Sequence, residues 1–546
     1  MKHVLLCGIV LFAAIVQGGY FMPALIVLNA SFMIWLLMDR RPVRLDIGLV
    51  FMLLLFAVMA ASAAFRSVDG YAALHELLKY SLFPLSYAVF RSLREDKRAG
   101  FAFDLAFFLL MAAGLMAAAG FSAAPGMVTV QGNRLQSFLQ YANTTALLMG
   151  AGALLSLDRL IGMRNKWQIP LALLFGAAML LTQSRTTLVL FLIILLLYAF
   201  DRLSPRAGLA AAGGIAGLAA AVLAFGGRLS RISLLEPTLV ERIISFHDAA
   251  RILAAETFGL GLGPGSWQYL QFAYQSAPYQ VRYVHNVFLQ AAMDGGVLAL
   301  LLLAGWWAYH LARSLKARGV YFYLFLFIAL HSLFEVDFNF GIVILFFSYV
   351  LTRLHPPDEV RLPKLSAPDR AERSRARWLL LAPLLALVVV FASEAFVARG
   401  DAASRANPAE AYRLYETALR LNPLNRAAMF KLAKIDRNPD SAIAWLEKSR
   451  ALNPHDDQVL AALSEGYRFK GDFGKSYFYA EELFRIFPYH RAHQEQVRQI
   501  LSYFHEHRII DEDYYLIEMQ KLEDQISALD ARIHPMYRHI RPDMDY

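Results

Sequence analysis

Histidine and arginine side chains stand at turns between long apolar runs, where a membrane protein could build a catalytic site. His285 follows a long polar insert and comes just before the apolar run that begins at Val287. A titratable imidazole at a water–membrane boundary could act as a general base. The alternative is a histidine that only caps the following helix. Asn286, beside it, is a possible supporting residue.

Arginines at the same kind of position could bind phosphate. Arg185 lies in the turn Thr182–Thr187, between two apolar runs. Arg242, Arg251 and Arg282 lie in the polar insert that ends at His285. A guanidinium group binds phosphate oxygens bidentately and keeps its charge. Two or more of these arginines could converge on a diphosphate, although each could also be an ordinary surface charge.

A further polar turn carries His331, Glu335 and Asp337. Ionisable residues at membrane depth are candidates for function, so His331 and Asp337 are possible supporting residues of the site. Two carboxylates could hold a divalent cation but form a weak metal signature. The single cysteine, Cys7, excludes a disulfide framework and a cysteine-based metal site. We therefore expect no metal site.

The elements that position these residues are predicted to be membrane helices. Apolar runs of spanning or near-spanning length predict an all-α fold, with a polytopic bundle of about 12–13 helices. Lys2 and an apolar run that is followed at once by a second one favour an uncleaved first helix over a signal peptide. His75, Glu76 and Lys79 share a face of the fourth helix, where an internal ion pair is expected. The runs begin at Val4, Tyr20, Ile47, Tyr71, Phe101, Phe138, Trp167, Leu188, Leu209, Val287, Val320, Phe340 and Trp378.

Basic residues recur after every second predicted helix and set the topology. The net charge of +9 comes mostly from these short clusters, which favours the positive-inside rule over a nucleic-acid partner. The intervening turns, including those of Arg185 and His331, then face outward, as does the long polar insert 226–285, and an odd helix count places the tail outside as well. The clusters predicted to be cytoplasmic are residues 39–44, 91–98, 159–166, 202–206, 313–318 and 370–377.

The polar insert 226–285 is too long for a simple connection, which predicts that it is folded or functional. Residues 239–256 have apolar side chains at helical spacing, and the glycine-rich segment 259–265 breaks that pattern. We therefore expect a helix followed by a sharp change of direction.

The tail after residue 400 changes to short amphipathic segments. Leu-Asn-Pro ends two of them, at Pro423 and Pro454, and Pro488 lies 34 residues beyond the second. This spacing resembles tetratricopeptide repeats, which stack helix pairs and bind proteins, while a plain helical domain with proline stops is the alternative. We expect a membrane domain over 1–400, repeats over 401–500 and a helical tail over 501–546.

The order of these features resembles the superfamily of O-antigen ligases and Wzy-type polymerases. The resemblance covers roughly residues 130–350, which would form the core of the enzyme. The segments that carry it are Arg134 to Phe138 with Asn143, Thr182 to Arg185, Gly261 to Trp267, His285-Asn286 with Gly296, and His331 to Asn339.

The resemblance implies an enzyme that takes a glycan from an undecaprenyl diphosphate carrier and transfers it to an acceptor hydroxyl outside the bacterial cytoplasmic membrane. It implies that His285 activates the acceptor and that Arg185 and Arg242 bind the diphosphate, with Arg282 as a substitute for Arg242. It also implies a reaction without metal or other cofactor. Ser137, Ala142 and Ala299 depart from residues typical of the family, which affects helix packing more than chemistry.

The leading hypothesis is therefore a multi-pass membrane glycosyltransferase that ligates or polymerises a lipid-linked glycan. Its acceptor would be a glycan, a lipid or a protein, and the repeats could bind protein partners. A lipid-linked oligosaccharide flippase is the rival of a different class, because many helices with scattered charges suit a transporter. A membrane-anchored repeat scaffold is the third possibility. The expectation for the scaffold role is that deleting residues 401–546 lowers assembly and spares intrinsic transfer.

Overall fold

The computed structural model describes residues 2–39, 45–94, 96–118, 130–131, 134–225, 237–256, 259–316, 318–356 and 379–540. Nearly all elements within these ranges are α-helices, which confirms the predicted all-α fold. The described strands, β1 (Val130–Gln131) and β2 (Arg134–Leu135), pair antiparallel in a short hairpin.

Each of the thirteen predicted apolar runs contains a helix. Five of these helices, α3, α5, α6, α12 and α16, are long and apolar enough to cross a membrane, while α1, α2, α7, α13 and α14 are apolar but shorter. The number of full crossings stays a prediction. The bounds are α1 (Lys2–Ile15), α2 (Met22–Met38), α3 (Ile47–Arg66), α4 (Gly70–Ser92), α5 (Lys97–Ala118), α6 (Ala142–Met163), α7 (Gln168–Leu181), α8 (Arg185–Arg202), α9 (Pro205–Phe225), α12 (Val287–Ser314), α13 (Val320–His331), α14 (Gly341–Leu354) and α16 (Leu381–Ala403).

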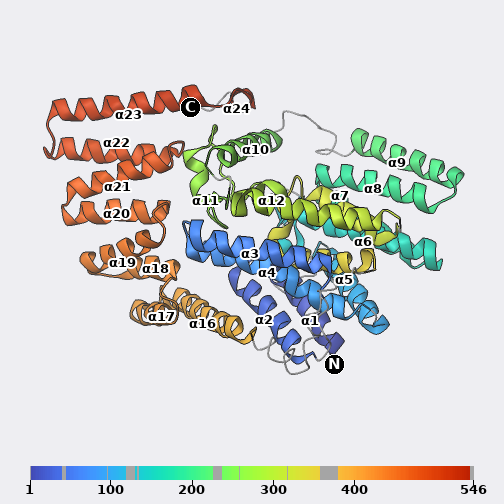
Figure 1. Cartoon of the computed structure of the whole chain (residues 1–546). Coiled ribbons are helices and arrows are strands. Elements are labelled where there is room, and N and C mark those ends of the chain that lie inside the picture. Colours follow the sequence, from blue (N-terminus) through green and yellow to red (C-terminus); the bar gives the residue numbers. More distant parts are fainter. Residues whose placement is uncertain are drawn as a thin grey trace.

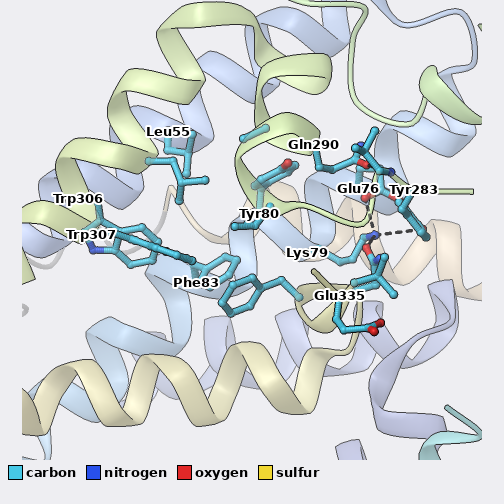
Figure 2. A pocket seen from close by; sticks show the side chains of 17 residues that line it. Leu55, Glu76, Lys79, Tyr80, Phe83, Tyr283, Gln290, Trp306, Trp307 and Glu335 are labelled. Carbon is cyan, nitrogen blue, oxygen red and sulfur yellow. Dashed lines mark hydrogen bonds and ion pairs between the residues drawn. The ribbon is translucent and has the colours of Figure 1, made fainter. Parts of the chain in front are cut away.

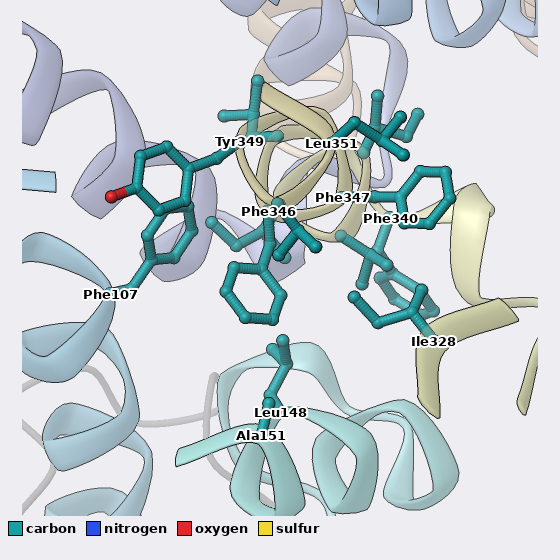
Figure 3. Close-up of a cluster of buried hydrophobic side chains, with 14 of the residues drawn as sticks. Phe107, Leu148, Ala151, Ile328, Phe340, Phe346, Phe347, Tyr349 and Leu351 are labelled. Atoms are coloured by element: carbon teal, nitrogen blue, oxygen red, sulfur yellow. The ribbon is translucent and has the colours of Figure 1, made fainter. Parts of the chain in front are cut away.

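Helix α14 lies at the centre of the bundle. Thirteen of its fourteen residues are buried, the exception being Arg353. A helix that is apolar all round must be enclosed by others. Figure 3 shows its side chains in contact with surrounding helices, where the rings of Phe346 and Phe107 lie 4.8 Å apart. This packing fixes residues 332–340, the turn that leads into α14.

The end of the bundle opposite the candidate site is held by ion pairs of the predicted cytoplasmic arginines. These pairs are Arg91–Asp46, Arg159–Asp104 and Arg202–Asp158. Other predicted segments fall outside the described residues, namely the basic turns 40–44 and 370–377, part of the insert at 226–236, and the last residues, 541–546.

The chain after α16 continues as consecutive helices that form a column along one end of the bundle, on the left in Figure 1. Pro423, Pro454 and Pro488 each follow shortly after the end of a helix, because proline cannot continue one. The bounds are α17 (Pro408–Leu421), α18 (Arg426–Ile435), α19 (Pro439–Leu452), α20 (Asp457–Lys470), α21 (Phe473–Ile486), α22 (Arg491–Glu506), α23 (Glu512–Arg532) and α24 (Pro535–Ile540).

The insert contains α10 (Pro237–Glu256), α11 (Trp267–Leu270) and the short 3-10 helix η4 (Gln271–Ala273). The predicted helix 239–256 is thus present. The glycine-rich segment that follows packs closely on α12, where the Leu262 amide donates to the Met293 carbonyl at 2.7 Å. Gly296 has a φ of +72°, and a Cβ there would collide with the Gly259 carbonyl. Two glycines therefore let the insert pass directly against α12.

The last helix of the chain, α24, returns to the insert. Tyr537 and Ile533, 2% and 4% exposed, join Val240 and Ile244 of α10 in one buried cluster. The amide of His534 donates to the Ser276 carbonyl at 2.8 Å. The C-terminal helices are therefore attached to the insert as well as to α16.

Candidate active site

Polar turns from separate parts of the chain meet at one end of the bundle. The Val287 amide donates to the Ser332 carbonyl at 3.0 Å and joins the start of α12 to the end of α13. The Arg134 Nε donates to the Thr182 carbonyl at 2.9 Å, which joins the segment before α6 to the turn before α8. Turns that the sequence assigned to one side of a membrane therefore lie together in space.

Asn286 is the residue that caps α12. Its side-chain oxygen accepts hydrogen bonds from the amides of Phe288 and Leu289 at 2.9 and 3.0 Å. Its side-chain nitrogen donates to the Leu333 carbonyl at 3.1 Å. A cap of this kind satisfies helix amides that have no partner within the helix. The capping role that was the alternative for His285 thus belongs to its neighbour.

His285 directly precedes that cap, and its Nδ1 is buried without a hydrogen-bond partner among the described residues. Burial, reinforced by the positive charge of Arg242, lowers the pKa of its imidazole to about 4, although the Glu335 carboxylate opposes the shift. The ring is therefore neutral at physiological pH. A buried polar atom without a partner is unusual and points to a ligand or a functional role.

Glu335 organises the surroundings of His285. Its carboxylate accepts hydrogen bonds from the Tyr141 hydroxyl and the Asn143 amide, both at 2.7 Å, and pairs with Arg242 Nη1 at 2.8 Å. Burial opposes ionisation, but Arg242 and the nearby imidazoles hold the pKa of Glu335 below its ordinary value. The negative charge of Glu335 therefore fixes Arg242 beside the His285 ring.

A chain of hydrogen bonds runs from Glu335 toward the turn of Arg185. The Asn143 side-chain oxygen accepts from Arg134 at 2.7 Å, and the same arginine reaches the Thr182 carbonyl. Arg185 is the first residue of α8 and follows Ser184, whose hydroxyl lies 2.7 Å from Thr187 Oγ1. The structure thus places Arg185 at the same end of the bundle as Arg242, on the far side of the Glu335 network.

His331 and Asp337 form a fully buried pair behind Glu335. The imidazole Nδ1 lies 2.6 Å from the Asp337 carboxylate, and Nε2 lies 2.7 Å from Thr187 Oγ1. The Thr144 hydroxyl donates to the other carboxylate oxygen at 2.9 Å. Both side chains have zero exposure, so they lie enclosed within the turn between α13 and α14.

Arg282 points away from Arg242. Its Nη1 donates to the Tyr20 hydroxyl at 3.1 Å, and its guanidinium lies over the rings of Tyr20 and Tyr283. It lines a cleft that faces the C-terminal helices, whereas Arg242 lies against Glu335. The structure therefore separates two arginines that the sequence treated as alternatives.

A pocket with one polar and one apolar end lies beside His285, between Val284 and Val287, which both line it. Figure 2 shows Glu76, Lys79 and Tyr283 at the polar end, while Trp306 and Trp307 form part of the apolar end. The Tyr283 hydroxyl donates to the Glu76 carboxylate at 3.0 Å, and Lys79 pairs with that carboxylate. The expected ion pair of the fourth helix is present.

The carboxylates considered as metal ligands are occupied by protein donors. Glu335 meets an arginine, a tyrosine and an asparagine, while Asp337 meets His331 and the Thr144 and Ser332 hydroxyls. Within the described ranges, no three side chains of histidine, cysteine, aspartate or glutamate form a group suited to a metal ion.

Sequence reasoning considered Glu335 only as a weak candidate metal ligand, and it gave no role to Arg134, Asn143 or Tyr141. The partners of Glu335 lie more than ninety positions away in the chain, so their spacing carries no signal. The sequence signal for a role of Glu335 was a carboxylate in an apolar turn. Such a group, once buried, requires positive or hydrogen-bonding partners.

The fold and this site define a multi-pass membrane protein with a candidate catalytic histidine at the mouth of a buried pocket. A family model described as O-antigen ligase matches residues 170–304. The match contains most of α7, all of α8 to α11 and most of α12, and thus Arg185, Arg242, Arg282, His285 and Asn286. It supports the resemblance to the ligase superfamily and covers about a quarter of the chain. No curated protein matches the chain.

Proposed function

We propose that this protein is a membrane glycosyltransferase that moves a glycan from an undecaprenyl diphosphate carrier to an acceptor hydroxyl at the outer face of a bacterial cytoplasmic membrane. The family match over residues 170–304 supports glycan transfer as the class of reaction. The observation that carries the proposal is the unpartnered, buried Nδ1 of His285 beside Arg242.

The neutral ring of His285 would remove the proton from the acceptor hydroxyl. The acceptor oxygen forms its bond to the anomeric carbon on the face opposite the departing oxygen, so the configuration inverts. The bond between that carbon and the diphosphate breaks, and the diphosphate leaves with the electron pair. Arg242 and Arg185 would stabilise the negative charge that develops on it.

Binding of the donor would raise the low pKa of His285 toward the range that a general base requires. A base works best when its pKa lies near the operating pH, and a pKa of about 4 is too low for that optimum. A bound diphosphate would offset the charge of Arg242, which is one cause of the low pKa. Binding of the donor would therefore make His285 a stronger base when it is needed.

We propose that the reaction uses no metal ion. The two arginines supply the positive charge that a cation supplies in other diphosphate-dependent enzymes. The nearest carboxylates, Glu335 and Asp337, are already engaged by donors of the protein.

The C-terminal helices would serve the acceptor or a protein partner, as stacked tetratricopeptide-like repeats do. Proline-terminated helices at α17, α19 and α21 support the repeat interpretation, with a helical tail after residue 500. We propose the division into a membrane domain and a repeat domain on this basis. Ligation and polymerisation both fit the site, because they differ only in the acceptor.

Complementation of an envelope-polysaccharide defect tests the proposal. We expect wild type to restore the polymer, and His285→Ala to fail while carrier-linked donor accumulates. The matched control is His507→Ala, an exposed histidine at the end of α22. Protein levels in the membrane must be equal. Restoration by His285→Ala at the wild-type level would end the assignment of His285 as the base.

The same experiment separates ligase from polymerase. A ligase variant leaves finished polymer on its carrier, whereas a polymerase variant leaves single units. A flippase would instead move labelled carrier across reconstituted vesicles without forming a glycosidic bond.

A further inference from the structure

A cleft of about 670 Å³ lies between the membrane bundle and the C-terminal helices. Its membrane side is formed by the starts of α2 and α4, by α11 and by Arg282, and its other side by α16 and by α18 to α20. The volume falls in the range of pockets that bind small organic ligands. The cleft is therefore large enough to hold several sugar residues.

Ion pairs and a hydrogen bond, together called the clamp, join the C-terminal helices to the membrane bundle at one wall of this cleft. Arg426 of α18 pairs with Asp69, the cap of α4, and with Asp456, both at 2.5 Å. The Asn453 side chain donates to Asp69 at 3.2 Å. Asp69 is 2% exposed, so its charge is compensated within the protein. The clamp fixes the two sides relative to each other and keeps the cleft from collapsing.

Two cations of the cleft are not held in an ion pair of this kind, although Glu76 lies close enough to Arg282 to raise the pKa of its guanidinium. Arg282 on the membrane side and Lys434 on the α18 side are both exposed, and no described carboxylate forms an ion pair with either of them. Each lies over aromatic rings instead, Arg282 over Tyr20 and Tyr283, and Lys434 over Phe430 at 4.6 Å. A cation held over a ring is oriented but keeps its ability to bind an anion.

The acidic residues of the cleft are already engaged. Asp456 pairs with Arg426, and Glu394 accepts from Asn425 at 2.9 Å. The Asp457 carboxylate accepts a local hydrogen bond from the backbone N–H of Gln458 at 2.9 Å and keeps its charge. Among the described residues, Arg426 pairs with Asp69 and Asp456, and Lys431 pairs with Asp401, so Arg282 and Lys434 are the cations of the cleft that form no ion pair.

The cleft adjoins the pocket beside His285 through a thin wall. His75 lines the cleft and Glu76 lines the pocket, and their side chains lie 3.1 Å apart. Tyr283, between Arg282 and His285 in the chain, lines the pocket as well. Arg242, proposed to hold the donor diphosphate, does not line the cleft. The cleft is thus separate from the proposed diphosphate-binding site.

We propose that this cleft binds the acceptor as an oligosaccharide that carries carboxylate groups. Arg282 and Lys434 would bind its acid groups from opposite sides, and the rings of Tyr269 and Phe430 would contact its sugar faces. That the bound glycan acts as the acceptor for His285 rests on the proposed function. That an acidic glycan binds in the cleft can be tested without glycan transfer.

Binding to the purified full-length protein tests the inference without a donor. The probes are tetragalacturonate, which is acidic, and maltotetraose, a neutral sugar of equal length. The variants are Arg282→Gln and Lys434→Gln. The control is Lys448→Gln, because Lys448 also lies over a ring, Trp445 at 4.3 Å, but does not line the cleft.

We expect tetragalacturonate to bind more tightly than maltotetraose, and each cleft variant to weaken it about tenfold, as loss of one charge-assisted contact does. Lys448→Gln and His285→Ala should bind like wild type, and high salt should weaken binding. Equal binding of both sugars, or unchanged affinity in both cleft variants, would overturn the inference. If hexaglutamate bound more tightly than tetragalacturonate, and at the same residues, the ligand would be an acidic polypeptide and the proposal of an acidic glycan would be wrong.

These outcomes are separate from those of the proposed function. Loss of binding in the cleft variants together with transfer by His285→Ala would keep the cleft and refute the catalytic role. Intact binding in the cleft variants together with inactive His285→Ala would refute the proposed cleft and keep the catalytic role of His285.

Discussion

The pKa of His285 should respond in opposite directions to two neutral substitutions around it. Arg242 lowers this pKa and Glu335 raises it, while burial is the largest cause of the low value. We therefore expect Arg242→Gln to raise the pKa of His285 and Glu335→Gln to lower it. A general polar environment without these specific charges would give no such pair of opposite effects.

The magnitude follows from the present value. The pKa lies at about 4 against an ordinary value of 6.5, a difference worth on the order of 3 kcal/mol between the two protonation states. Because burial contributes most, we expect removal of the Arg242 charge to bring the pKa to roughly 5, a change of about 1.4 kcal/mol.

The assay is a nuclear magnetic resonance titration of the imidazole in the purified protein, assigned by comparison with His285→Gln. It requires no catalytic activity, so it works for variants that lose diphosphate binding. Where transfer is measurable, activity depends on the neutral ring and falls as pH drops through the pKa of His285. The acid limb of Arg242→Gln should then begin at higher pH than in wild type.

Shifts of both variants in the same direction, or no shift in either, would refute the arrangement of charges around His285. A non-reactive diphosphate added to wild type offers a second check, because it should raise the pKa as Arg242→Gln does. An unchanged pKa at saturating diphosphate would place the anion away from Arg242.

Three further substitutions test the framework, each by thermal unfolding in detergent at matched expression. Gly296→Ala should destabilise by roughly 1–3 kcal/mol, because the residue has a positive φ and its Cβ would collide with Gly259. Asp337→Ala should cost about 3–5 kcal/mol, since it leaves the fully buried His331 and its neighbours without a counter-charge. Tyr537→Ala should cost about 3 kcal/mol by removing a buried ring between α24 and α10. Unchanged melting temperatures would show that these contacts contribute little.

Local patterns in the sequence were sufficient to place most elements. Hydrophobic runs predicted thirteen helices, and the spacing over 239–256 predicted α10. The prolines after α17, α19 and α21 marked helix ends because a ring without an N–H disfavours continuation of a helix, although Pro84 lies inside α4. These predictions succeed since each depends on neighbouring residues alone.

Contacts between distant residues could not be predicted in the same way. Arg282 and Arg242 are both arginines of one polar insert, and only the family resemblance favoured Arg242, with Arg282 as its substitute. Only the packing of α10 against the turn of Glu335, and of Tyr20 against Arg282, separates them. Likewise, a cap was expected as an alternative for His285, yet the adjacent asparagine has the geometry that a cap requires.

The attachment of α24 to α10 changes the interpretation of a tail deletion. The tail was expected to act as a separable module, so that its removal would spare intrinsic transfer. In the structure, Tyr537 and Ile533 complete a buried cluster on the helix that carries Arg242. Removing them would expose apolar side chains of α10 and loosen the arginine beside His285. Loss of transfer after such a deletion is therefore expected from the position of Arg242 alone, and it does not by itself demonstrate that a partner is bound by the repeats.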